Sequence, residues 1–185
     1  MDAALDWLQK TALAIHIRDS LLLFPLLEAT HVIGLAIVVG TVVIIDLRLL
    51  GLATTHRAFS RLGADTLPWT LGGFGIAAVT GGLMFSTNAT VYFHNTWFRA
   101  KVLLLVLAAM NAILFELTAR RTIVDWDLRR STPPVARAIA AMSLVIWIGV
   151  IVAGRMIGFT ATRGTINQTA PAAQPDFEDL LGLPK

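Results

Sequence analysis

Two ionisable residues, Glu28 and His31, lie inside the apolar run LLLFPLLEATHVIGLAIVVGTVVII at residues 21–45. A run of this length can cross a bilayer, and an ionisable group within it costs free energy unless it is paired or used. His31 is expected about 13 to 15 Å along the helix from Leu22, near the middle of a hydrocarbon core about 30 Å thick. The E-x-x-H spacing puts both side chains on one helix face, where the carboxylate could fix the imidazole tautomer or share its proton. This pattern indicates an axial haem ligand, a proton relay or an ion site, with a histidine hydrogen-bonded between helices as the structural alternative.

The composition is typical of a helical membrane domain. Of the 185 residues, 56% are hydrophobic and 15% charged, and the mean hydropathy is +0.70. The chain has no cysteine, which excludes disulfides, thiolate catalysis, iron–sulfur clusters and cysteine-type zinc sites within it. The net charge is +3, but the basic residues stand beside the apolar runs, so we interpret them as topology determinants and expect no nucleic-acid partner.

The hydropathy pattern predicts an all-α fold, an integral membrane four-helix bundle with an N-terminal interfacial helix within residues 2–17. One transmembrane domain is expected over residues 1–160, with spans at about 21–45, 67–85, 97–117 and 135–159. In the second span, Ala77 with Gly81 and Ala78 with Gly82 form small-xxx-small pairs that allow close helix packing. Residues 161–185 are polar and are expected to form a mostly flexible tail.

Charge predicts the orientation of this bundle. With four spans, the linkers after the first and third helices share one side of the membrane, and both termini lie on the other. The linker side collects most of the arginines: Arg48, Arg57, Arg61, Arg120, Arg121, Arg129, Arg130 and Arg137. The positive-inside rule therefore predicts termini on the periplasmic side of a bacterial inner membrane.

The same topology brings five polar residues into the outer half of the bundle: Glu28, His31, His94, Lys101 and Arg155. A histidine at mid-depth below cations is typical of a b-type haem site, because iron takes imidazole and the propionates need positive partners. We expect His31 to bind the haem iron and Lys101 and Arg155 to hold the propionates. Glu28 would tune His31 or pass protons.

The second iron ligand is open at this point. The second, third and fourth spans contain no histidine. His94 folding inward from its loop, or Lys101, could supply the ligand, with Met84 and Met156 as further candidates. Alternatively, the iron is five-coordinate and open to a small molecule.

Two stretches carry a family resemblance: HVIGLAIVVG…DLRLLG at residues 31–51 and FRAKVLLLVLAAMN at residues 98–111. Over about residues 20–160 the chain resembles a family of uncharacterised bacterial four-helix membrane proteins. It is more distantly similar to the CopD-type membrane domain of copper resistance and to HemJ-type membrane protoporphyrinogen oxidases. In HemJ-type proteins a first-helix histidine and a third-helix lysine are associated with haem, so the resemblance implies this role for His31 and Lys101. The chain departs at Asn111, near where a HemJ-like chain is expected to carry a histidine, so the resemblance implies haem binding rather than protoporphyrinogen oxidation.

These observations favour a membrane b-type cytochrome-like protein that binds haem b through His31. It would transfer electrons between membrane or periplasmic partners, such as a redox protein or a quinone, as an oxidoreductase or the membrane subunit of one. The lipid bilayer is its expected environment. One alternative is a proton- or copper-handling transport module that uses Glu28 and His31 and forms a homo-oligomer. Another is a structural accessory membrane subunit.

Overall fold

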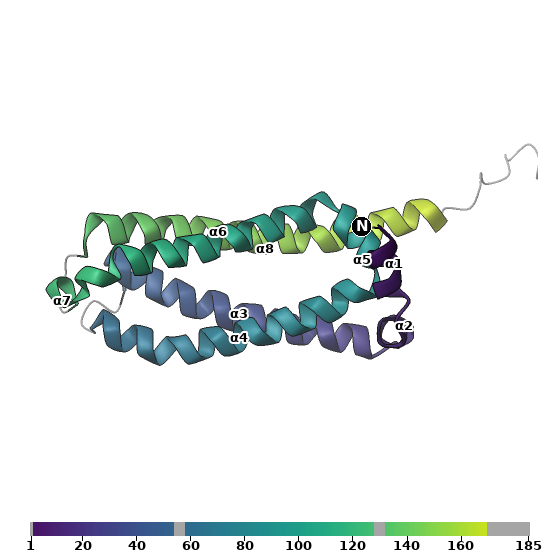
Figure 1. Ribbon diagram of the computed structural model, residues 1–185, viewed down its shortest axis with the longest axis horizontal. Coiled ribbons are helices and arrows are strands. Elements are labelled where there is room, and N and C mark those ends of the chain that lie inside the picture. The colour runs from purple at the N-terminus through teal and green to yellow at the C-terminus, as the bar shows by residue number, and fades with distance from the viewer. Residues whose placement is uncertain (1, 54–57, 128–131, 170–185) are drawn as a thin grey trace, which may run out of the picture.

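Long apolar segments dominate the chain, and they form long helices that run side by side (Figure 1). The computed structural model describes residues 2–53, 58–127 and 132–169, which are helical and contain no strand. Four of the helices are long and apolar enough to cross a membrane, as predicted. They are α3 (Leu23–Leu50), α4 (Phe59–Thr87), α6 (Thr96–Leu117) and α8 (Pro134–Thr169).

The helix boundaries lie beyond the predicted spans. α3 continues to Leu50, where Gly51 ends it with a left-handed φ of 78° that favours glycine. α4 begins at Phe59 rather than near residue 67, so Pro68 lies inside the helix. α8 runs on to Thr169, so residues 161–169 of the expected tail are helical. The rest of that tail, residues 170–185, lies outside the described residues.

The N-terminal region forms two short helices, not the single helix expected over residues 2–17. These are α1 (Asp2–Gln9) and α2 (Ala12–Asp19). The break falls at Thr11, whose hydroxyl oxygen accepts a hydrogen bond from the backbone N–H of Ala14 at 3.4 Å and so caps α2. α1 packs on α5 (Ala89–His94) and α2 packs on α4. Together they cover the end of the bundle that holds α5 (Figure 1).

The four long helices form two pairs, α3 with α4 and α6 with α8, and α3 packs on α8 to join them (Figure 1). Val38 of α3 is buried with Trp147 and Val150 of α8 at the middle of the bundle. A second apolar cluster lies toward the end with η1 (Arg120–Thr122) and α7 (Ile123–Trp126). Its buried members are Leu49, Phe59, Ala119, Trp126, Ala136 and Ala140.

Asp127 connects three elements at this α7 end. Its carboxylate accepts hydrogen bonds from the Ser60 N–H at 2.8 Å and the Ser60 hydroxyl at 2.6 Å, which caps the start of α4. Its backbone oxygen accepts from Nη2 of Arg48 at 3.2 Å. Partial burial acts to raise the pKa of Asp127, but the hydrogen bonds from Ser60 and Phe59 and the charge of Arg48 outweigh it. The pKa of this carboxyl therefore lies below its usual value.

Asp46 and Arg48, near the end of α3, are both buried in the protein. Asp46 is 5% exposed and Arg48 is fully buried. The guanidinium of Arg48 reaches the Asp127 backbone, a partner almost 80 residues away in sequence. The far end of α3 is therefore covered by the segment that follows α6.

The closest contact between α3 and α4 is made by glycine backbone. A Cβ added at Gly34 would lie 2.9 Å from the Gly73 carbonyl oxygen and 3.0 Å from the Ala77 nitrogen. Gly73 and Ala77 thus form the small-xxx-small pair that packs on α3, whereas Ala78 and Gly82 are exposed.

We expect Gly34→Ala to destabilise the bundle by about 1 to 3 kcal/mol, because the added methyl meets backbone that cannot move aside. Gly40→Ala on the same helix is the matched control, since nothing lies within 4 Å of its Cβ position. It should leave stability unchanged or raise it by up to about 1 kcal/mol through helix propensity. Unfolding in mixed detergent–SDS micelles measures both, and equal effects would contradict the packing described here.

Candidate functional site

His31 of α3 is held by a hydroxyl of α4. Its Nδ1 lies 3.1 Å from Oγ1 of Thr80, and the Thr80 hydroxyl donates to the Ile76 carbonyl at 2.6 Å. Because that hydroxyl hydrogen is already used, the Thr80 oxygen acts as acceptor, and we assign the imidazole proton to Nδ1. Nε2 of His31 then carries the free lone pair.

That lone pair faces Lys101 of α6. The Nζ of Lys101 lies 3.5 Å from Nε2 of His31, and both side chains are partly buried. The two residues belong to different helix pairs, α3 with α4 and α6 with α8. The α3–α4 pair and the α6–α8 pair therefore each contribute one basic nitrogen to the same place in the bundle.

A glycine adjoins each of these nitrogen groups. A Cβ at Gly81 of α4 would lie 2.9 Å from Cε1 of His31, so a side chain there would displace the imidazole. A Cβ at Gly154 of α8 would lie 3.8 Å from Nζ of Lys101, which is ordinary contact distance. On two of the four long helices, the residue beside the His31–Lys101 pair is thus a glycine.

Glu28 does not bond to His31, although the E-x-x-H spacing suggested it. Its side chain is exposed and forms no hydrogen bond or ion pair with any described residue. The pKa of the Tyr92 phenol in α5 is raised, mainly by burial and also by the negative charge of Glu28. Thr80, which sequence reasoning passed over as part of a packing helix, orients the imidazole instead.

His94 and Arg155 do not join the pair. His94 is exposed, donates from Nδ1 to the Thr90 carbonyl at 2.9 Å, and has Nε2 3.9 Å from Asp2 of α1. Arg155 is exposed, with its guanidinium carbon 4.7 Å from the centre of the Phe159 ring on the same helix. Of the five candidate residues, the structure brings His31 and Lys101 together at hydrogen-bond distance.

The chemistry of these donors suits a metal that brings most of its own ligands. The described residues hold no group of three or more His, Cys, Asp or Glu side chains that could bind a metal ion unaided. A metal between two nitrogens needs about 4 Å between them, because metal–nitrogen bonds are about 2 Å long. The 3.5 Å separation is close to this span. His31 and Lys101 are therefore the two residues that would hold such a metal, through their Nε2 and Nζ atoms.

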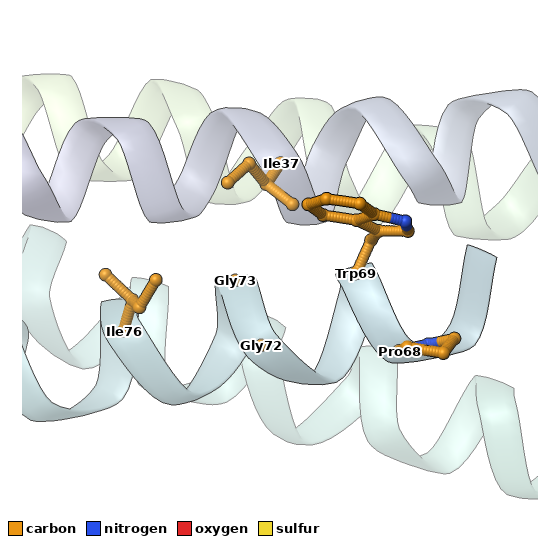
Figure 2. Close-up of a pocket in the computed structure, with 6 residues that line it drawn as sticks. All are labelled: Ile37, Pro68, Trp69, Gly72, Gly73 and Ile76. Atoms are coloured by element: carbon orange, nitrogen blue, oxygen red, sulfur yellow. The ribbon is translucent and has the colours of Figure 1, made fainter.

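A separate apolar groove of about 380 Å³ lies between α3 and α4 (Figure 2). Ile37 of α3 faces five residues of α4 across it, namely Pro68, Trp69, Gly72, Gly73 and Ile76. Its lining has no titratable side chain and includes neither His31 nor Lys101. The groove is therefore distinct from the histidine–lysine site.

Thr80→Val should release the imidazole proton from Nδ1, because the hydroxyl acceptor is lost while the side-chain shape is kept. A neutral hydrogen bond of about 0.5 to 1.5 kcal/mol corresponds to a roughly 2- to 10-fold shift in tautomer ratio toward Nε2–H. Nitrogen-15 NMR of histidine-labelled protein measures the ratio. Thr66→Val is the control, since the Thr66 hydroxyl bonds only carbonyl oxygens of its own helix. An unchanged His31 spectrum in Thr80→Val would contradict the assigned tautomer.

Comparison with known proteins gives one result for this chain. No curated protein and no solved structure matches it. A family model described as a family of unknown function, DUF6644, matches residues 22–160, which include α3, α4 and α6 in full and α8 to Thr160. The chain therefore belongs to the DUF6644 family of unknown function.

Proposed function

We propose that this chain is an integral protein of the bacterial inner membrane that binds one b-type haem between His31 and Lys101. It transfers electrons between membrane or periplasmic partners, with both termini on the periplasmic side. The observation that carries the proposal is the 3.5 Å approach of Nε2 of His31 to Nζ of Lys101 from two different helix pairs.

The outer surface of the bundle supports insertion in a bilayer. Large apolar side chains are exposed on every long helix, including Val32, Val79, Leu103 and Val145 at 58%, 64%, 60% and 69%. Soluble monomers rarely expose contiguous apolar surface on this scale. Lipid chains would cover it.

Each site residue has a defined task in this proposal. Thr80 holds the imidazole so that the Nε2 lone pair is available to the metal. Lys101 would supply the second ligand in its unprotonated form. Arg155 would be a cationic partner for a propionate. A bound haem would supply the one-electron couple that no side chain here provides.

The sequence resemblance to HemJ-type proteins supports the same pair, because it assigns haem roles to His31 and Lys101. The transport alternative has less support. Glu28 is exposed and does not hydrogen-bond to His31, so its link to the imidazole is through charge alone. The described residues also lack a cluster of metal-binding side chains suited to copper.

Absorption spectra of detergent-purified protein, oxidised and dithionite-reduced, test the haem. Wild type, expressed with ample haem supply, should show a Soret band and sharp reduced α and β bands. His31→Ala should retain haem at least about tenfold more weakly, since it removes a ligand rather than an outer contact. Lys101→Ala should convert the spectrum to a five-coordinate, high-spin form.

His94→Ala and His16→Ala are the controls, because His94 lies with Asp2 and His16 is exposed on α2. Both should keep the wild-type spectrum. A colourless wild type would reject the proposal. A spectrum lost in His94→Ala but kept in Lys101→Ala would reject Lys101 as the second ligand.

Orientation can be tested directly because the chain has no native cysteine. Gln9→Cys in α1 and Arg61→Cys in α4 place single thiols at opposite ends of the bundle, the second on an exposed residue. A membrane-impermeant maleimide should label Gln9→Cys in spheroplasts and label Arg61→Cys only after permeabilisation. The reverse pattern would place the termini in the cytoplasm.

A further inference from the structure

A second polar layer crosses the bundle in the half opposite His31. It consists of Asp46 of α3, Asn111 of α6 and Ser143 of α8, which are 5%, 8% and 8% exposed. Along α8 the layer lies between the apolar cluster at Ala136 and Ala140 and the one at Trp147 and Val150. Three helices thus each carry a buried polar side chain at a depth where their neighbours are apolar, and α8 connects them, because Ser143 lies near Asp46 and Ile139 accepts from Asn111.

The layer has more acceptors than donors. The Ser143 hydroxyl lies near the Asp46 carboxyl, whose Oδ2 is buried and has no hydrogen-bond partner. Asn111 donates from Nδ2 to the Ile139 carbonyl at 3.2 Å, one turn from Ser143, and its buried Oδ1 also has no partner. An unpaired buried acceptor is costly, so each of these oxygens requires a donor.

No basic side chain of the described region supplies one to Asp46. The guanidinium of Arg48, two residues away on α3, donates to the Asp127 backbone. On α6, Glu116 is exposed and paired with Arg120. Arg61, Asp65 and Arg137, near this end of the neighbouring helices, are exposed, and Arg99, Lys101 and Arg155 lie in the other half of the bundle.

We propose that Asp46, together with Ser143 and Asn111, forms a proton-binding site in the α7 half of the bundle. An ionised carboxylate buried without a cation is strongly unfavourable, whereas the protonated carboxyl is neutral and provides the missing O–H donor. Asp46 lies four residues before the end of α3 at Leu50, about 6 Å along the helix axis. Between Asp46 and that end lie the buried Leu49 and Trp126, which keep water away from the carboxyl.

A metal cation fits the layer less well than a proton. Hard cations take six or more oxygen ligands, and here the described residues offer one carboxyl, one amide and one hydroxyl. The proposal does not depend on haem at His31, because the two layers occupy opposite halves of α3.

Infrared spectroscopy of the full chain in an ester-free detergent tests the site. At neutral pH the wild type should show a carboxylic acid C=O band that shifts down in heavy water, while exposed carboxyls are ionised and do not contribute. Asp46→Asn should remove this band. Glu116→Gln, an exposed carboxyl on α6, should keep it. Ser143→Ala should move it to higher frequency, because the hydroxyl near the carboxyl is lost.

The absence of the band in wild type would overturn the proposal, as would its persistence in Asp46→Asn. Sodium-dependent thermal stability that is lost in Asp46→Asn, without an acid band in wild type, would identify a cation site instead. If Asp46→Asn does not fold, Ser143→Ala decides the question, and an unmoved band in that variant rejects Asp46 as its source.

Discussion

The close approach of α3 to α4 at Gly34 and Gly73 is the contact on which the candidate site depends. A Cβ on either glycine would lie 2.9 Å from the backbone oxygen of the other. Between apolar helices in lipid there is little hydrophobic drive to associate, so such backbone contact supplies much of the packing energy. His31 lies one turn before Gly34, and the antiparallel α4 brings Thr80 to the same level. The imidazole is therefore oriented because the two backbones touch one turn away.

The position of Lys101 depends on a second set of contacts, because α6 reaches α3 chiefly through α8. Val38 of α3 packs on Trp147 and Val150, and α6 is aligned on α8 where Gly149 meets the Leu104 side chain. The distance between the imidazole and the ammonium group thus depends on the relative position of the two helix pairs. A relative shift of the pairs would open or close this gap without breaking either pair.

Hydropathy was sufficient to predict four long helices, and alternating topology was sufficient to predict that His31 and Lys101 share one half of the bundle. Neither predicts their contact, because α3 and α6 are apolar on all faces and the pattern does not specify helix rotation. Thr80 was missed for the same reason. The burial of Arg48 was not predicted, because its acceptor, the Asp127 backbone, lies in a distant segment. The start of α4 was placed too late because Pro68 suggested a helix beginning, whereas Asp127 caps Ser60.

The two polar layers differ in what they leave room for. His31 lies against Gly81 and Lys101 beside Gly154, so glycine backbone borders this layer on α4 and α8. Asp46 and Ser143 lie between two apolar clusters that contain Trp147 and Trp126, bulky side chains that fill the interior. In the first layer both imidazole nitrogens meet a polar partner, whereas Oδ2 of Asp46 and Oδ1 of Asn111 in the second have none. The haem that we propose belongs to the His31 layer, and a ligand no larger than a proton suits the Asp46 layer.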